Sequence, residues 1–99
     1  MIVIAGTVRI APGSLDRFRD EMTAMIEASR AENGCIRYAY AIDTLDAGIM
    51  HVAEAWRDMA ALKAHFTAPH MADWQKVTTQ IGVTERNLVL YKTDEGKAL

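Results

Sequence analysis

This chain of 99 residues lacks most of the features that would assign it to a special class of protein. Its single cysteine, Cys35, excludes an internal disulfide and favours a reducing compartment such as the cytoplasm. The formal net charge of −2 gives no electrostatic basis for binding nucleic acid or an anionic membrane. No apolar run approaches the roughly 20 residues of a membrane span, and the N-terminus has no basic leader, so neither an anchor nor a signal peptide is expected.

The residues that are present are those of an ordinary globular domain. Hydrophobic residues make up 51% of the chain and charged residues 24%, which is typical of a soluble protein. Because a chain this short supports a single hydrophobic core, we expect one domain over residues 1–93. The polar residues 94–99 are expected to form a flexible tail.

Apolar periodicity predicts two kinds of element. Ile- and Val-rich segments bounded by turn residues predict strands over residues 2–10, 35–44, 49–56 and 83–92. The turn at residues 46–48 is expected to join the second and third strands as a hairpin.

The helices are predicted from spacing and from their capping residues. Apolar residues at spacings of three and four predict a helix that Ser14 caps and that ends near Asn33, before Gly34. Asp58 is expected to cap a short helix over residues 59–66, and Pro69 to begin a further segment that runs to about residue 80. The resulting order, β-α-β-β-α-β, predicts an α+β, ferredoxin-like split βαβ fold with an antiparallel four-stranded sheet.

Both faces of the first and third predicted strands are largely apolar. Ile2 and Ile4 alternate with Val3 and Ala5, for example, yet the helices of this fold cover only one face of the sheet. A second copy of the sheet is the simplest cover for the other face, so we expect a homodimer built sheet to sheet.

Several short motifs, in this order of elements, resemble those of the antibiotic-biosynthesis monooxygenase family of dimeric α/β-barrel proteins, which includes quinol monooxygenases. The residues that carry the resemblance are Glu32-Asn33-Gly34-Cys35, Tyr38, Glu54-Ala55-Trp56, Ala61-Leu62, His65 and His70. The resemblance implies a pocket between helices and sheet in each subunit. It also implies oxygenation of an electron-rich phenol or quinol by O₂ without metal or flavin, so we expect no cofactor.

Within that interpretation, His65 and His70 are the candidate catalytic residues, because a histidine can accept or donate a proton near neutral pH. The candidate substrate-binding residues are Tyr38, Glu54, Trp56 and Trp74. Two alternatives stay open. One is an isomerase or epimerase of a small hydroxyketone, with or without a phosphate group, and the other is a non-catalytic module that binds a hydrophobic metabolite.

Each candidate residue also has a structural interpretation. His65 can bond a backbone carbonyl at its helix end, and His70 can serve as a cap or hinge beside Pro69. Glu54 lies among apolar residues, so its carboxylate needs a partner. That partner is expected to be a backbone amide or an arginine, from the set Arg9, Arg37 and Arg86.

Metal and haem sites are not expected. His65 and His70 are five residues apart across a proline, which is not the spacing of one helix face, and His51 lies on a separate strand. The family resemblance places a haem-ligating histidine in the later helix, where this chain has a residue near Gln75 instead.

Overall fold

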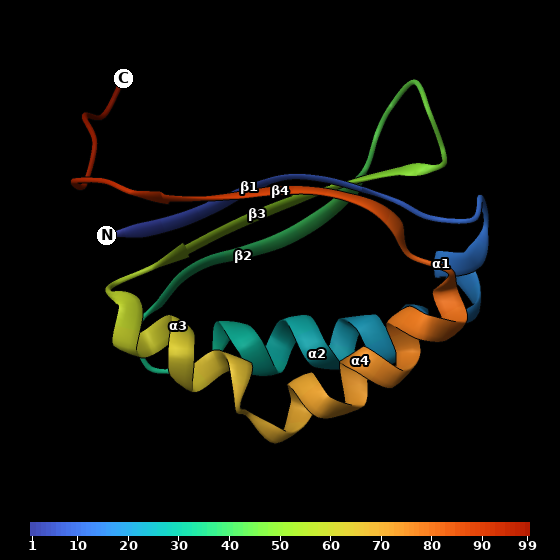
Figure 1. Cartoon of the computed structure of the whole chain (residues 1–99), viewed down its shortest axis with the longest axis horizontal. Coiled ribbons are helices and arrows are strands. Elements are labelled where there is room, and N and C mark those ends of the chain that lie inside the picture. The colour runs from blue at the N-terminus through green and yellow to red at the C-terminus, as the bar shows by residue number, and fades with distance from the viewer.

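Four antiparallel strands form a single sheet in the order β2-β3-β1-β4. The computed structural model describes all residues 1–99, with strands β1 (Ile2–Arg9), β2 (Cys35–Ile42), β3 (Ile49–Trp56) and β4 (Thr84–Lys92). The helices are α1 (Ser14–Arg17), α2 (Arg19–Arg30), α3 (Met59–Phe66) and α4 (Pro69–Ile81), and they lie on one face of the sheet (Figure 1). The predicted α+β, ferredoxin-like fold is therefore confirmed.

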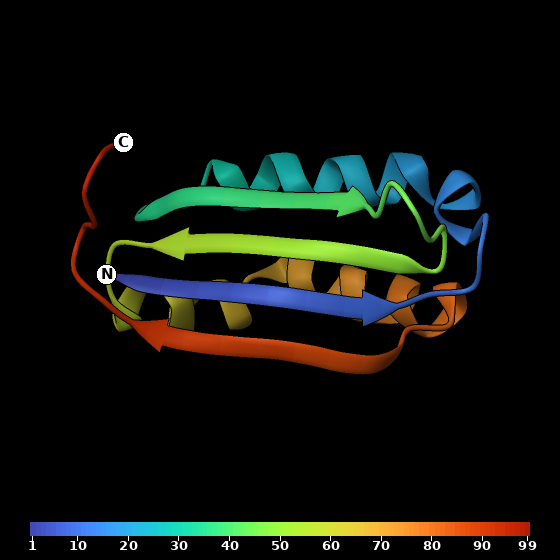
Figure 2. The same cartoon turned by 90° about the horizontal axis from the view of Figure 1, so that it is seen from above.

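The two edges of the sheet differ in what covers them. Seen from above, α2 runs along the β2 side of the sheet, whereas α3 and α4 lie behind β1 and β4 (Figure 2).

Strand β1 is central because it pairs with both β3 and β4. The register aligns one row of side chains across the helix-facing side, which consists of Tyr38, Glu54, Ile4 and Leu90. This row forms the floor of the site described below.

The first predicted helix is wrong in two details. It breaks at Phe18, whose backbone (φ −117°, ψ 21°) lies outside the helical region, so that a one-turn α1 precedes α2. Ser14 is not the N-cap, because Gly13 takes that position with φ 81° and the buried Ser14 Oγ has no hydrogen-bond partner. The buried side chains of Leu15 and Phe18 both enter the core at this turn, and their packing overrides the local capping preference.

The other element ends agree better with the predictions. The Asp58 carboxylate accepts a hydrogen bond from the Ala61 amide at 2.9 Å, which confirms the predicted cap of α3. Helix α2 ends at Arg30, three residues before the predicted end, and Gly34 has φ 85°. A Cβ at Gly34 would lie 2.6 Å from the Cβ of Ala61, so only glycine allows this turn to pack against α3.

The hydrophobic core fills the space between the sheet and the helices and includes Trp56, Leu62 and Ile81, which are almost completely buried. Strand β4 lies outside it, since all of its residues are exposed. None of the helices is both long enough and apolar enough to cross a bilayer. Residues 93–99 form neither helix nor strand.

Candidate functional site

The carboxylate of Glu32 joins two imidazole rings that come from different helices. Its Oε2 lies 2.6 Å from Nδ1 of His65, near the end of α3, and 3.0 Å from Nε2 of His70, in the first turn of α4. Glu32 itself stands in the connection between α2 and β2. The His65 side chain is 1% exposed, and those of Glu32 and His70 are 16% and 23% exposed.

These contacts determine which nitrogen of each ring carries a proton. A carboxylate oxygen only accepts hydrogen bonds, so His65 donates from Nδ1 and His70 donates from Nε2. In the neutral form of His65, the other nitrogen, Nε2, is therefore an acceptor. Glu32 therefore holds neutral His65 in the tautomer whose Nε2 is free of a proton.

Aromatic rings surround the imidazole of His65. The ring centroids lie 4.7 Å from Trp56, 5.3 Å from Tyr38 and 5.9 Å from Phe66. These contacts leave the ring little freedom to rotate and exclude water from its faces. Electrostatic interactions with His65 are stronger in such surroundings than in water.

His65 lines a cavity of about 400 Å³ between α4, β4 and the helix-facing side of the sheet. A cavity of this size suits a small organic molecule. Its other lining residues are Ile4, Tyr38, Tyr40, Glu54, Phe66, Met71, Trp74, Gln75, Thr78, Arg86, Leu88, Val89 and Leu90. Most of this wall is apolar or aromatic, and its formally charged side chains are one glutamate and one arginine.

Two tyrosine hydroxyls supply neutral hydrogen-bonding groups in the wall. The hydroxyls of Tyr38 and Tyr40 lie 2.9 Å apart, as their alternation on β2 predicts. Burial raises the pKa of Tyr38 far above its usual range and that of Tyr40 to about 12. Both phenols are therefore protonated at neutral pH, and one hydroxyl hydrogen remains for a ligand after the other is shared between them.

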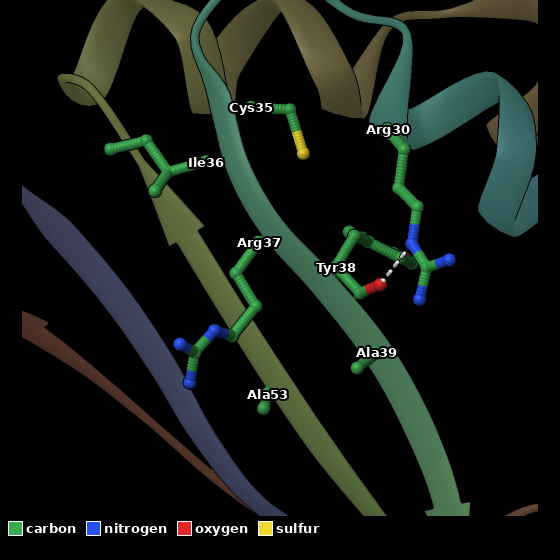
Figure 3. A pocket seen from close by; sticks show the side chains of 7 residues that line it. All are labelled: Arg30, Cys35, Ile36, Arg37, Tyr38, Ala39 and Ala53. Atoms are coloured by element: carbon green, nitrogen blue, oxygen red, sulfur yellow. Dashed lines mark hydrogen bonds between the residues drawn. The ribbon is translucent and has the colours of Figure 1, made fainter.

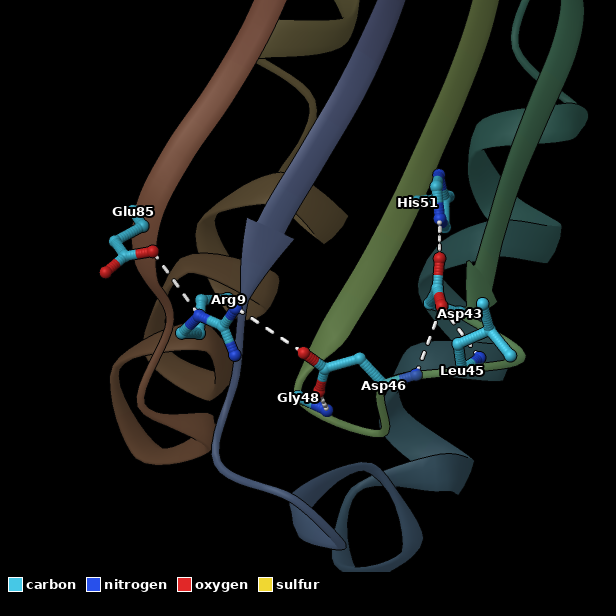
Figure 4. Close-up of polar contacts among 7 residues, drawn as sticks. All are labelled: Arg9, Asp43, Leu45, Asp46, Gly48, His51 and Glu85. Atoms are coloured by element: carbon cyan, nitrogen blue, oxygen red, sulfur yellow. Dashed lines mark hydrogen bonds and ion pairs between the residues drawn. The ribbon is translucent and has the colours of Figure 1, made fainter.

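Glu54 is a buried carboxylate at the centre of the cavity floor. Its Oε1 accepts a hydrogen bond from the indole Nε1 of Trp56 at 3.0 Å, so the predicted arginine or amide partner is wrong. Arg9 pairs instead with Asp46 and Glu85 at the far end of the sheet (Figure 4). Burial raises the pKa of Glu54 despite the indole bond.

The fold and the pattern of the motifs have counterparts among known proteins. The family model for antibiotic biosynthesis monooxygenase matches residues 1–77. This chain belongs to that family. The protein sll1783 of Synechocystis is 30% identical over 98 residues, which cover 99% of this chain and 67% of the relative.

Solved structures agree with this assignment at the level of the fold. A candidate antibiotic biosynthesis monooxygenase of Deinococcus radiodurans superposes with a TM-score of 0.86 at 21% identity, over 100% of this chain and 98% of that one. PA3566 of Pseudomonas aeruginosa is 30% identical, with a TM-score of 0.70 over 91% of this chain and 87% of that one.

In this member of the antibiotic biosynthesis monooxygenase family, four of the six predicted site residues line the cavity, namely Tyr38, Glu54, His65 and Trp74. Trp56 is completely buried and lies against His65. His70 lines a separate hollow between α2 and α4 and reaches the site through Glu32. His65 and His70 lie on different helices, as their spacing across Pro69 predicts, yet the break between α3 and α4 brings their ring centroids to 6.0 Å.

Sequence reasoning missed Glu32 as a site residue. It is separated from His65 by 33 residues and from His70 by 38, and the only signal that linked them was their shared place among the motifs of the family resemblance. Arg86 was considered only as a partner for Glu54, whereas it lines the cavity. His51 lies elsewhere, paired with Asp43 beside the β2–β3 turn (Figure 4).

A second hollow lies along β2 and β3 and, at about 560 Å³, is larger than the His65 cavity (Figure 3). Its lining offers few groups that could take part in a reaction. Small side chains, Ala39 and Ala53, line part of it, and the Arg30 guanidinium donates to the backbone carbonyl of Tyr38 at 2.8 Å. Burial raises the pKa of the Cys35 thiol, which disfavours the nucleophilic thiolate. We therefore place the candidate active site in the His65 cavity.

Proposed function

We propose that the protein is a cofactor-independent monooxygenase that oxidises a quinol or polyphenolic compound with O₂. The observation that carries this proposal is the orientation of His65. Its Nδ1 is held by Glu32, its ring packs among aromatic side chains, and it lines a cavity of the right size for one aromatic ring system.

The reaction begins with removal of a proton. Nε2 of His65 accepts the proton of a bound quinol hydroxyl, and Glu32 stabilises the imidazolium that forms. The quinolate passes one electron to O₂, and the resulting radicals combine at a ring carbon to give a peroxide. Loss of water from the peroxide leaves a hydroxyquinone, so that one quinol and one O₂ give one hydroxyquinone and one H₂O. The quinol itself supplies all the electrons, which is why no cofactor is required.

Other residues of the cavity would position the substrate. The Tyr38–Tyr40 hydroxyl pair offers one donor to a second quinol oxygen. Trp74 and Phe66 provide apolar surface for the ring and keep water from the peroxide.

The charges of the cavity favour a polyphenol over a phosphorylated hydroxyketone. A phosphate carries close to two negative charges and is usually met by several cationic or amide donors. Here Arg86 is the single cation in the wall, it lies on the exposed strand β4, and the buried carboxylate of Glu54 would repel an anion. A neutral aromatic substrate avoids that repulsion.

Oxygen uptake with a panel of hydroquinones tests the proposal. We expect the wild-type protein to consume O₂ faster than buffer and to incorporate one ¹⁸O atom from ¹⁸O₂ into the product. His65→Gln should lower kcat about 100-fold or more, because a positioned general base contributes at least that factor. His51→Gln, which changes a histidine outside the cavity, is the matched control. Wild-type uptake no faster than buffer, or full activity in His65→Gln, would contradict the proposal.

We also propose that the protein acts as a homodimer, in the cytoplasm, with two sheets packed face to face. The sheet face turned away from the helices carries a row of small apolar residues that consists of Ala39, Ala53, Ala5 and Val89. No element of the chain covers this face (Figure 1). A second copy of the sheet would bury it.

Light scattering at micromolar concentration tests the assembly. We expect a dimer mass for the wild type and a monomer mass for Ala53→Glu, which places a charge within the apolar face. Ala64→Glu is the control, because Ala64 is exposed on α3, which lies on the helix side of the sheet and away from the proposed interface. A monomeric wild type would rule out the homodimer.

A further inference from the structure

We propose that Glu32, His65 and His70 form a binding site for a first-row divalent metal ion such as Zn²⁺. Glu32 Oε2, His65 Nδ1 and His70 Nε2 all lie within 4.8 Å of one another, on three separate elements of the fold. The inference concerns the Nδ1 edge of the His65 ring, which contacts Glu32, and binding there does not depend on the proposed oxidation.

The donor set is the first reason. Two imidazole nitrogens and one carboxylate oxygen are ligands that Zn²⁺ accepts, at about 2.0–2.2 Å each. With three protein ligands the ion keeps a fourth position for water, as in open zinc sites. Imidazole-rich sites also suit Co²⁺, Ni²⁺ and Cu²⁺, whereas Mg²⁺ and Ca²⁺ prefer oxygen ligands.

The second reason is that the three donors already converge on one point. The two nitrogens approach the same oxygen, at 2.6 Å and 3.0 Å, so small side-chain movements allow an ion to replace the two shared protons. Both rings bind in the neutral form after each proton moves to the opposite ring nitrogen, and no change in backbone conformation is needed.

Accessibility and support are the third reason. Glu32 and His70 are partly exposed, so an ion and its water ligand can reach the site from solvent. The His65 ring is held from behind by Trp56 and Tyr38, and this packing keeps its Nδ1 aimed at the other two ligands. Groups that orient a ligand in this way strengthen metal binding.

The His51–Asp43 pair is the natural contrast. It has the same two chemical groups at 2.7 Å, but it lacks a second imidazole and its histidine is half exposed. Two ligands on an exposed surface do not form a comparable site, so this pair serves as an internal control for adventitious binding.

Metal binding would change the cavity side of His65. With the ion on Nδ1, the ring proton is on Nε2, which then donates to a ligand in the cavity and no longer accepts a proton. The ion would therefore inhibit the proposed oxidation. This consequence rests on the proposed function, whereas the metal site itself does not.

Titration of the metal-free protein with Zn²⁺ against a chromophoric chelator tests the site directly. We expect one tight equivalent per chain, and we expect Co²⁺ in place of Zn²⁺ to give the visible absorption of a tetrahedral ion. Glu32→Gln and His70→Gln should each weaken Zn²⁺ binding at least about 10-fold, because each removes one ligand. His51→Gln should leave the affinity unchanged.

Folding of each variant is checked by circular dichroism, and Glu32→Asp provides a second variant that retains a carboxylate. Zn²⁺ should also raise the Tm of the wild type, since it binds the folded state only. Absence of a one-equivalent site, or Zn²⁺ binding that Glu32→Gln and His70→Gln leave intact, would overturn the proposal. Oxygen uptake without Zn²⁺ binding contradicts the metal site alone, and Zn²⁺ binding without oxygen uptake contradicts the oxidation alone.

Discussion

Two histidine–carboxylate pairs in this protein have nearly the same geometry and very different surroundings. His65 and Glu32 lie 2.6 Å apart with the histidine 1% exposed, whereas His51 and Asp43 lie 2.7 Å apart with the histidine 52% exposed. The first pair adjoins an aromatic cavity and a second histidine, and the second pair lies beside a surface turn (Figure 4). The chemical groups are alike, so the surroundings decide what each pair can do.

The exposed pair is explained by the turn that contains it. Oδ1 of Asp43 accepts hydrogen bonds from the backbone amides of Leu45 and Asp46, which shape the β2–β3 connection. The hydrogen bond from His51, followed by those of the turn, holds the pKa of Asp43 below its usual range. Exposed ion pairs of this kind contribute little to stability, because water and salt screen them.

The largest difference is expected when each carboxylate is removed. Glu32→Ala leaves two histidines without their partner, one of them buried, and should lower the free energy of unfolding by about 1.5–3 kcal/mol, the range for a hydrogen bond to a charged group. Asp43→Ala should shift the urea midpoint much less. Equal losses for the two variants would show that burial does not distinguish the pairs.

A smaller change in stability is expected when pH alters the charge of Glu54, the buried carboxylate of the cavity floor. The pKa of Glu54 is raised, so the folded protein holds this proton more tightly than the unfolded chain does. Stability should therefore fall as pH rises from 4.5 through the folded-state pKa, and Glu54→Gln should remove this dependence.

At pH 7, Glu54→Gln should be more stable than wild type by about 1 kcal/mol, since the amide oxygen still accepts the Trp56 hydrogen bond without the cost of burying a charge. Urea unfolding between pH 4 and pH 8 measures both effects. A variant less stable than wild type at pH 7 would mean that the carboxylate stabilises the fold. The expected gain in stability would instead indicate that Glu54 is retained although it destabilises the fold, as is common in functional sites.

The smallest effect of pH on stability is expected from the aspartates Asp43 and Asp58. Its sign is opposite to that of Glu54. The pKa of Asp43 is lowered by its His51 bond, and that of Asp58 by the Ala61 amide it caps. Their contribution is fully present above pH 3.8 and is lost as pH falls through the folded-state values. Asp43→Asn should be slightly less stable than wild type near pH 7, and this difference should disappear as the pH falls from 4 to 2. A difference that persists at pH 2 would contradict this assignment.

Much of the fold could be predicted because it depends on local signals. Strand alternation and the Asp58 cap act over a few residues, and the β-α-β-β-α-β order follows from them. The break at Phe18 was missed because long-range packing of its ring outweighs helix periodicity.

The candidate site was less predictable, because it depends on contacts between distant positions. Glu32 contacts both His65 and His70 only because the chain bends at the junction between α3 and α4. The Glu54–Trp56 bond joins two residues on the same face of one strand, a contact that alternation permits but does not require.

Strand β4 forms one wall of the cavity on the helix-facing side of the sheet. Its other side forms part of the open sheet face. Leu88 and Leu90 line the cavity, while Val89, which also borders the cavity, and Tyr91 alternate with them along the strand. Strand β4 is an edge strand, as β2 is, but all of its residues are exposed, so we expect it to separate from the sheet and to exchange its amide hydrogens sooner than β2. Whatever packs against the outer side of β4 also stiffens the inner wall. In the proposed homodimer, subunit association and ligand affinity would therefore be linked thermodynamically through β4, and each would depend on both the protein and the ligand concentration.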